Sequence, residues 1–182
     1  MNYKNLDISH KTALITGGSI GIGFGIAKEL FEAGCKIIIV GRDEHNLAKA
    51  MESLSISDAS IYPFMADVSK ETERTRLINF VESTFGQLDI LVNNVGTNIR
   101  KKIDEYSPDE IQLLFSTNLF SAVDLSRRLL PLLKKSENAS VVNISSVAGL
   151  GHLKTGAIYG MTKAALIQLT KNLAVEWAGD NI

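Results

Sequence analysis

The chain has 182 residues, a formal net charge of -1 and an apolar content of 45%. This length suffices for one domain with a substantial core, and the balanced charge argues against nucleic acid as a partner. No apolar run is long enough to cross a membrane, and the polar start from Met1 to Lys11 lacks the apolar centre of a signal peptide. Cys35 is the sole cysteine, which excludes an internal disulfide and favours a cytoplasmic protein with a buried thiol.

Short apolar runs alternate along the chain with longer helical patterns. Five runs are predicted to be strands, at residues 13–15, 37–40, 61–65, 90–92 and 141–144. Their continuous apolarity is typical of strands that are buried on both faces of a parallel sheet. Pro63 places the third run at a sheet edge or at a strand start, because proline cannot donate to a strand ladder.

The first three predicted helices each follow one of these strands. Two of them carry apolar stripes at helical spacing, formed by Ile22, Ile26 and Leu30 and by Leu47, Met51 and Leu54. Gly34 is placed to end the first helix, and Asp43 is placed to cap the second. Ser69 is predicted to cap the third helix, which runs towards Thr84.

The fourth helix has a strong start signal: Ser107 is the cap, Pro108 takes the first helical position, and Glu110 closes a capping box. We expect this helix to reach about Lys135, with Pro131 bending or ending it.

The fifth helix carries Tyr159 and Lys163 and reaches about Trp177. Alternating strands and helices in this order predict an α/β fold, a Rossmann-type doubly wound parallel sheet with helices on both faces. We expect a single dinucleotide-binding and catalytic domain over residues 1–182.

A glycine-rich loop from Thr16 to Gly23 follows the first strand and opens the first helix. Glycines permit a tight turn and close approach to a pyrophosphate, and the helix N-terminus offers free N–H groups. The loop is therefore predicted to bind a cofactor through Gly17, Ser19, Ile20, Gly21, Ile22 and Gly23. A turn that binds nothing is the alternative, whereas a P-loop NTPase would need a Lys-Ser or Lys-Thr pair after the loop.

Arg42 follows the second strand, where a carboxylate favours a ribose diol and an arginine favours a 2′-phosphate. Asp43 is interpreted as a helix cap, so it does not decide the cofactor. The sequence therefore favours NADP(H), with NAD(H) as the weaker alternative.

Tyr159 and Lys163 stand four residues apart and so share one face of a helix. An ammonium favours ionisation of a neighbouring phenol, which suits proton transfer. Ser146, thirteen residues before the tyrosine, is placed to hold a carbonyl or alcohol oxygen within its reach. The same spacing also occurs on solvated helix faces, so the pair alone leaves that alternative open.

Together these motifs resemble the short-chain dehydrogenase/reductase family, in its tropinone-reductase-like branch. The resemblance covers nearly the whole chain and adds three matches: Asp67-Val68, the motif Asn93-Asn94-Val95-Gly96, and Asn118. Val95 departs from the family pattern, which has alanine there. Ile20 is a second departure, because members that prefer NADPH often carry a basic residue at that position.

The resemblance implies hydride transfer between NADP(H) and a ketone or secondary alcohol. It implies catalytic roles for Asn118, Ser146, Tyr159 and Lys163, with the substrate bound by Ser146 and Tyr159. Tyr159 would exchange the proton, Lys163 would bind the nicotinamide ribose, and Asn118 would position a water that links Lys163 to solvent. The cofactor residues implied beyond the glycine loop and Arg42 are Asp67, Val68, Asn94, Gly96, Tyr159 and Lys163.

Family members usually continue for several tens of residues beyond Ile182, so we expect a fold that lacks their last strands and turns over poorly by itself. A non-catalytic nucleotide-binding or regulatory module therefore stays open as the alternative. The resemblance also implies a small-molecule carbonyl or alcohol as partner and a homodimer or homotetramer. Arg100 and His152 are expected on solvated surface, with a place in the substrate cleft as the alternative for each. The Arg127-Arg128 pair is also expected on solvated surface, and no residue pattern predicts a metal site.

Overall fold

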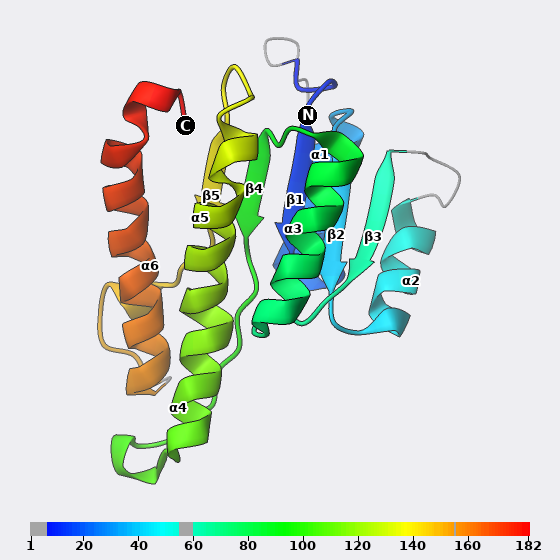
Figure 1. Cartoon of the computed structure of the whole chain (residues 1–182). Coiled ribbons are helices and arrows are strands. Elements are labelled where there is room, and N and C mark those ends of the chain that lie inside the picture. Colours follow the sequence, from blue (N-terminus) through cyan, green and yellow to red (C-terminus); the bar gives the residue numbers. More distant parts are fainter. Residues whose placement is uncertain (1–6, 55–59, 155) are drawn as a thin grey trace.

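The structure is a computed structural model that describes residues 7–54, 60–154 and 156–182. Its centre is a parallel sheet with the strand order β3-β2-β1-β4-β5 (Figure 1). The strands are β1 (Thr12–Thr16), β2 (Lys36–Gly41), β3 (Ile61–Met65), β4 (Ile90–Asn93) and β5 (Ser140–Asn143). The predicted doubly wound sheet is confirmed, and Pro63 lies in β3 at one edge, where a missing N–H is tolerated.

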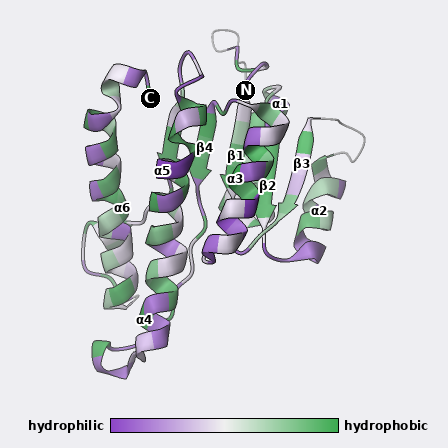
Figure 2. Cartoon of the chain, in the orientation of Figure 1, coloured by the Kyte–Doolittle hydropathy of each residue, from purple (hydrophilic) through white to green (hydrophobic). Residues whose placement is uncertain are grey.

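Helices cover both faces of the sheet. They are α1 (Gly21–Glu32), α2 (Glu44–Leu54), α3 (Glu71–Phe85), α4 (Pro108–Phe115), α5 (Ser121–Leu133) and α6 (Ala157–Glu176). Successive residues of a strand point to opposite faces, so Leu14 joins the core beneath α3 and α5, whereas Ala13 and Ile15 join the core beneath α1 and α2. Figure 2 shows the resulting pattern, with mostly hydrophobic central strands between helices that are hydrophilic on part of their surface.

Two of the three residues predicted as the apolar stripe of α1, Ile26 and Leu30, pack against the core, but Ile22 does not. Ile22 is 69% exposed, and the buried residues of this helix are Gly23 and Ala27. The reason lies in the preceding loop, because a Cβ atom on Gly23 would overlap the carbonyl oxygen of Gly17. This close approach turns Gly23 inwards and leaves Ile22 facing outwards.

The predicted cap of α3 is wrong. The cap residue is Lys70, which makes no side-chain capping bond. Ser69 instead donates its hydroxyl to Asp67 Oδ1 at 2.7 Å, and its backbone N–H donates to the same oxygen at 3.0 Å. The carboxylate of Asp67 therefore organises this turn, and Ser69 is its donor. Asp43 does cap α2 as predicted, since its Oδ1 accepts from Asn46 N–H at 2.8 Å.

The predicted fourth helix is an almost continuous rod made of α4, a π-helical turn η2 (Ser116–Phe120) and α5. Ser107 and Glu110 form the predicted capping box. Pro131 lies inside α5, and the helix continues two residues further, to Leu133. The proline is tolerated because it lies in the last turn, where few i→i−4 bonds remain to be lost.

At the other edge of the sheet, β5 pairs with β4, and Val142 is 43% exposed. The chain returns to this edge at its end: Ala139 N–H donates to Asn181 O, and Lys134 pairs with Asp180 at 2.9 Å. No helix of the described ranges is both long and apolar enough to cross a membrane.

Asp89 lies at the amino end of β4 and connects it to the amino end of β1 and to the segment before β5. Its carboxylate accepts from Thr12 N–H at 2.8 Å, Ser136 Oγ at 2.6 Å and Gln87 Nε2 at 3.0 Å, and the residue is 4% exposed. Burial by itself would raise the pKa of Asp89, but the hydrogen bonds from Ser136, Thr12 and Gln87 outweigh it and lower the pKa below 3.8. A group with a lowered pKa stabilises the fold above its unfolded pKa and loses that contribution in acid.

We expect Asp89→Asn to lower the free energy of unfolding by about 2 kcal/mol at pH 7, because an amide cannot accept all three bonds. Urea unfolding should show the difference from wild type shrinking in acid, as the pH falls from the ordinary pKa of an unfolded aspartate through the lower pKa of the folded one. Asp104→Asn, at an exposed position, is the control. A loss that is the same at every pH would contradict this assignment.

Candidate functional site

A cleft of about 490 Å³ opens at the carboxyl ends of β1, β2, β3 and β4. Parallel sheets bind ligands at this edge, where the strand order reverses on the two sides of β1. The predicted cofactor residues that line it are Gly17, Ser19, Ile20, Ile22, Arg42, Asp67, Val68, Asn94 and Gly96. Asn46, Thr97 and Thr117 also line it and were missed, because no motif marks them; Thr117 could have been suspected only as the neighbour of Asn118.

Asn94 fixes the glycine loop from the end of β4. Its Nδ2 donates to Thr16 O at 3.0 Å and to Gly17 O at 3.2 Å, and its backbone N–H donates to Thr16 Oγ1 at 3.0 Å. A Cβ atom on Gly23 would overlap both Gly17 O and Asn94 Nδ2. The side chain predicted to touch a cofactor is thus engaged in holding the loop, which closes tightly only around a glycine.

The N-terminus of α1 is open towards the cleft. Its cap residue Ile20 makes no side-chain capping bond, and the first turn carries no acidic residue. The first N–H groups of a helix lack intrahelical partners and attract anions. Gly41 completes the cradle, since a Cβ atom there would lie 2.8 Å from Ser19 Oγ. These features fit the pyrophosphate of a dinucleotide.

Arg42 and Asp67 stand at the ends of β2 and β3, at the other end of the cleft. Burial of Asp67 by itself would raise its pKa, but hydrogen bonds from Ser69 and the positive charges of Lys70 and Arg42 outweigh it, so the pKa is lowered. The carboxylate is ionised at neutral pH and lies near the exposed guanidinium of Arg42.

Lys163 is buried in α6, with 3% of its surface exposed. Its Nζ donates to Ile144 O at 2.8 Å and lies 5.8 Å from the centre of the Tyr159 ring. Burial lowers the pKa of Lys163, because desolvation disfavours the charged amine. Gly96 leaves the room for this group, since a Cβ atom there would lie 3.3 Å from Nζ.

Asn118 lies in the π-helical turn η2 and is 1% exposed. Its Oδ1 accepts from Thr97 N–H at 2.7 Å, and its Nδ2 donates to Thr97 O at 2.9 Å and to Thr162 Oγ1 at 3.2 Å. These bonds join the loop after β4, the long helical rod and α6. Asn118 Oδ1 also flanks Gly96, which brings it beside Lys163.

Ser146 begins a short 3-10 turn, η3 (Val147–Gly149), and its Oγ accepts from Ala148 N–H at 3.1 Å. The turn is held on α6 by Ser145 Oγ, which donates to Lys163 O at 2.8 Å. Gly149 allows the contact, since a Cβ atom there would lie 2.7 Å from the carbonyl carbon of Lys163. Ser146 is thereby fixed against the helix that carries Tyr159 and Lys163.

Residues outside this arrangement behave as surface. Arg100 and His152 are exposed, and neither lines the cleft, although His152 borders a shallow groove between η3 and α6. Cys35 is fully buried, and burial raises the pKa of its thiol to about 11, so it is core. Within the described ranges, no three His, Cys, Asp or Glu side chains gather as a metal site would require.

Comparison with known proteins agrees with this geometry. The sequence model described as short chain dehydrogenase matches residues 11–182, and the chain belongs to that family of oxidoreductases. Its relatives include a tropinone reductase homolog of Arabidopsis thaliana, 47% identical over 180 residues, which are 98% of this chain and 68% of the relative. Senescence-associated protein 13 of the same plant is 45% identical over 94% of this chain and 64% of its own length. The tropinone-reductase-like resemblance is confirmed.

Solved structures give the same class. L-sorbose reductase from Gluconobacter frateurii, complexed with NADPH and L-sorbose, superposes with a TM-score of 0.91 at 34% identity, over 97% of this chain and 68% of that one. The Pseudomonas aeruginosa RhlG/NADP complex superposes with a TM-score of 0.89 at 36% identity, over 97% and 70%. The chain thus spans about two-thirds of the length of these proteins.

We expect Gly23→Ala to destabilise the protein by about 2 kcal/mol or more, because its methyl group has no room beside Gly17 O. Gly25→Ala, in the same helix with nothing within 4 Å of its added Cβ, should stabilise it by about 0.5–1 kcal/mol. Urea unfolding of the two variants tests this directly. Equal effects of the two substitutions would show that the loop does not depend on this contact.

Proposed function

We propose that the protein transfers hydride between NADP(H) and a ketone or secondary alcohol, with Tyr159 as the proton-exchanging residue. The observation that carries the proposal is the buried Lys163 ammonium, held at Ile144 O beside the Tyr159 ring and joined to the cofactor cleft through Gly96. Family membership and relatives solved with NADPH and NADP support the same reaction class.

The dinucleotide would lie along the carboxyl edge of the sheet. The loop over α1 would bind its pyrophosphate, and Arg42 would pair with the 2′-phosphate through its planar fork. Asp67 and Val68 would border the adenine, and Lys163 would bind the nicotinamide ribose. When bound, the cofactor supplies or accepts the hydride.

The protein residues would handle the proton. A ketone oxygen that gains negative charge needs donors, and the two hydroxyls we assign to this role are those of Ser146, at the start of η3, and Tyr159, on α6. Tyr159 would release its proton to that oxygen, while the charge of Lys163 favours the phenolate that remains. Asn118 would hold the water through which the proton is replaced.

A nucleotide-binding module without turnover is the competing function. The observation in its favour is that the chain spans about two-thirds of its relatives' length. Retention of Ser146, Tyr159 and Lys163 argues against it, because nucleotide binding alone would not require all three. We further propose a cytoplasmic location and a homodimer or homotetramer, from the single buried thiol and from the family resemblance.

Tyr159→Phe should lower kcat for ketone reduction by about 100-fold or more and change the Kd for NADPH far less, because the proton donor is removed while the ring stays in place. The measurement is NADPH oxidation with a panel of small ketones, alongside NADPH binding by fluorescence. Tyr62→Phe, in β3 and not among the residues that line the cleft, is the matched control. NADPH binding without turnover that depends on Tyr159 would favour the nucleotide-binding module.

Arg42→Ala should weaken NADPH binding by about tenfold, equivalent to roughly 1.4 kcal/mol, and leave NADH binding unchanged. The physical reason is that only the 2′-phosphate distinguishes the two cofactors. Lys36→Ala removes a positive charge from the opposite end of the same strand and should change neither Kd. Equal losses for NADPH and NADH would exclude Arg42 as the residue that selects the phosphate.

A further inference from the structure

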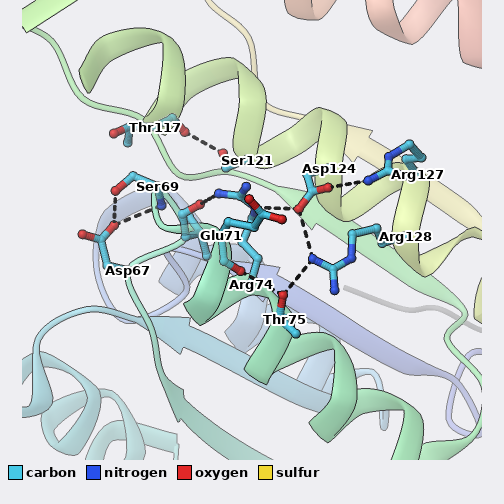
Figure 3. Close-up of polar contacts among 11 residues, drawn as sticks. Asp67, Ser69, Glu71, Arg74, Thr75, Thr117, Ser121, Asp124, Arg127 and Arg128 are labelled. Atoms are coloured by element: carbon cyan, nitrogen blue, oxygen red, sulfur yellow. Dashed lines mark hydrogen bonds and ion pairs between the residues drawn. The ribbon is translucent and has the colours of Figure 1, made fainter. Parts of the chain in front are cut away.

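Three arginines converge on one carboxylate between α3 and α5. Asp124 of α5 accepts from Arg74 Nε at 2.8 Å, from Arg127 Nη2 at 2.9 Å and from Arg128 Nη1 at 3.5 Å (Figure 3). Burial of Asp124 by itself would raise its pKa, but the hydrogen bonds and charges of the arginines outweigh it and lower the pKa. The three arginines differ in how deeply their side chains are buried.

Arg74 is the buried member. Its side chain is 9% exposed, against 24% for Arg128 and 72% for Arg127. A buried guanidinium is stable only where its donors are satisfied. The expectation that the Arg127-Arg128 pair forms a solvated face therefore holds for Arg127 alone, since Arg128 also donates to Thr75 Oγ1 at 3.0 Å.

The second contact of Arg74 points to the cofactor cleft. Its Nη1 donates to Val68 O at 2.8 Å, while its Nε holds Asp124. Val68 lines the cleft, and its neighbours Asp67 and Ser69 form the turn described above, which Figure 3 shows beside Arg74. Of the arginines around Asp124, Arg74 is the one that bridges the helix pair and the cleft wall.

We propose that Arg74 is a positioning residue for the adenosine end of the cofactor, and that Asp124 orients it. The guanidinium fixes the Val68 carbonyl and with it the backbone of residues 67–69, so the cleft wall is set by the packing of α3 against α5. Lysine cannot replace it, because one ammonium does not span two acceptors that need a planar fork. This inference rests on the proposed cofactor site.

The test uses the two halves of the cofactor as separate probes. Arg74→Lys should weaken binding of 2′,5′-ADP about tenfold, the effect of a substitution that acts on a site without touching its ligand. Binding of nicotinamide mononucleotide should stay unchanged. Arg128→Lys is the matched control, since Arg128 shares Asp124 but does not contact Val68, and it should alter neither affinity.

Calorimetry gives the affinities, and urea unfolding gives the stability of each variant. Asp124→Asn is the second variant, because it keeps Arg74 and its bond to Val68 O; it should weaken 2′,5′-ADP binding by about threefold. If Arg74→Lys does not fold, unchanged binding by Asp124→Asn overturns the proposal. Equal losses for both fragments would reveal general destabilisation and overturn it as well.

Binding measurements on the wild-type protein distinguish a failure of the proposed role of Arg74 from a failure of the proposed function. Wild type that binds 2′,5′-ADP, together with an Arg74→Lys variant that binds it equally well, would overturn the role of Arg74 and leave the proposed function intact. Wild type that binds neither 2′,5′-ADP nor NADPH would overturn the proposed function and this inference with it.

Discussion

The burial of one ammonium group sets the arrangement of the site. Lys163 lies among segments from four parts of the chain: the exit of β4 at Gly96, the π-helical turn at Asn118, the exit of β5 at Ile144 and the turn η3. A buried amine is costly unless it is hydrogen-bonded, and Ile144 O supplies the acceptor. Glycine at position 96 suits this arrangement, because a Cβ atom there would lie 3.3 Å from the amine, a tight contact.

The rod between α4 and α5 is not a regular helix, and its irregular turn lies at the same site. A π-helical turn adds one residue to the helix circumference and is often found at functional sites. Here it carries Asn118, whose amide holds both the N–H and the carbonyl of Thr97. The loop after β4 is thereby pinned to the rod, and the same amide reaches Thr162 of α6. The irregular turn serves to join three segments around Lys163.

Much of the fold could be predicted because its signals are local. Continuous apolar runs located all five strands, and glycine spacing located the loop over α1. The two failures came from specific contacts in the turns that precede α1 and α3, which the apolar and capping patterns do not reveal. Ile22 matched a helical stripe, yet the approach of Gly23 to Gly17 O decides the rotation of α1. Ser69 matched a helix cap, yet the carboxylate of Asp67 captures its hydroxyl.

The residues of the site also divide into those that a sequence pattern marks and those that only their contacts reveal. Ser146, Tyr159 and Lys163, the residues proposed for proton transfer, could be singled out from the sequence because their spacing along the chain suits that chemistry. Thr97 and Thr117 could not, because they are ordinary polar residues until Asn118 and the π-helical turn bring them to the cleft. The position of Arg74 could not be predicted either. A single arginine on a charged helix does not indicate that its side chain is buried between a carboxylate and a carbonyl.

The two halves of the site differ in how they are supported. The cofactor cleft is built from the ends of β1 to β4, whose side chains are largely buried and whose turns are tied by Asn94 and Arg74. The half that we propose for proton transfer depends on α6, whose buried residues Ile158, Thr162, Lys163 and Leu166 all lie in its first half. Beyond them the helix exposes residues such as Val175, at 80%. Stability in a helix comes mainly from the packing of one face, so Tyr159 and Lys163 are held by the contacts of η3, Asn118 and Ile144 rather than by the length of the helix that carries them.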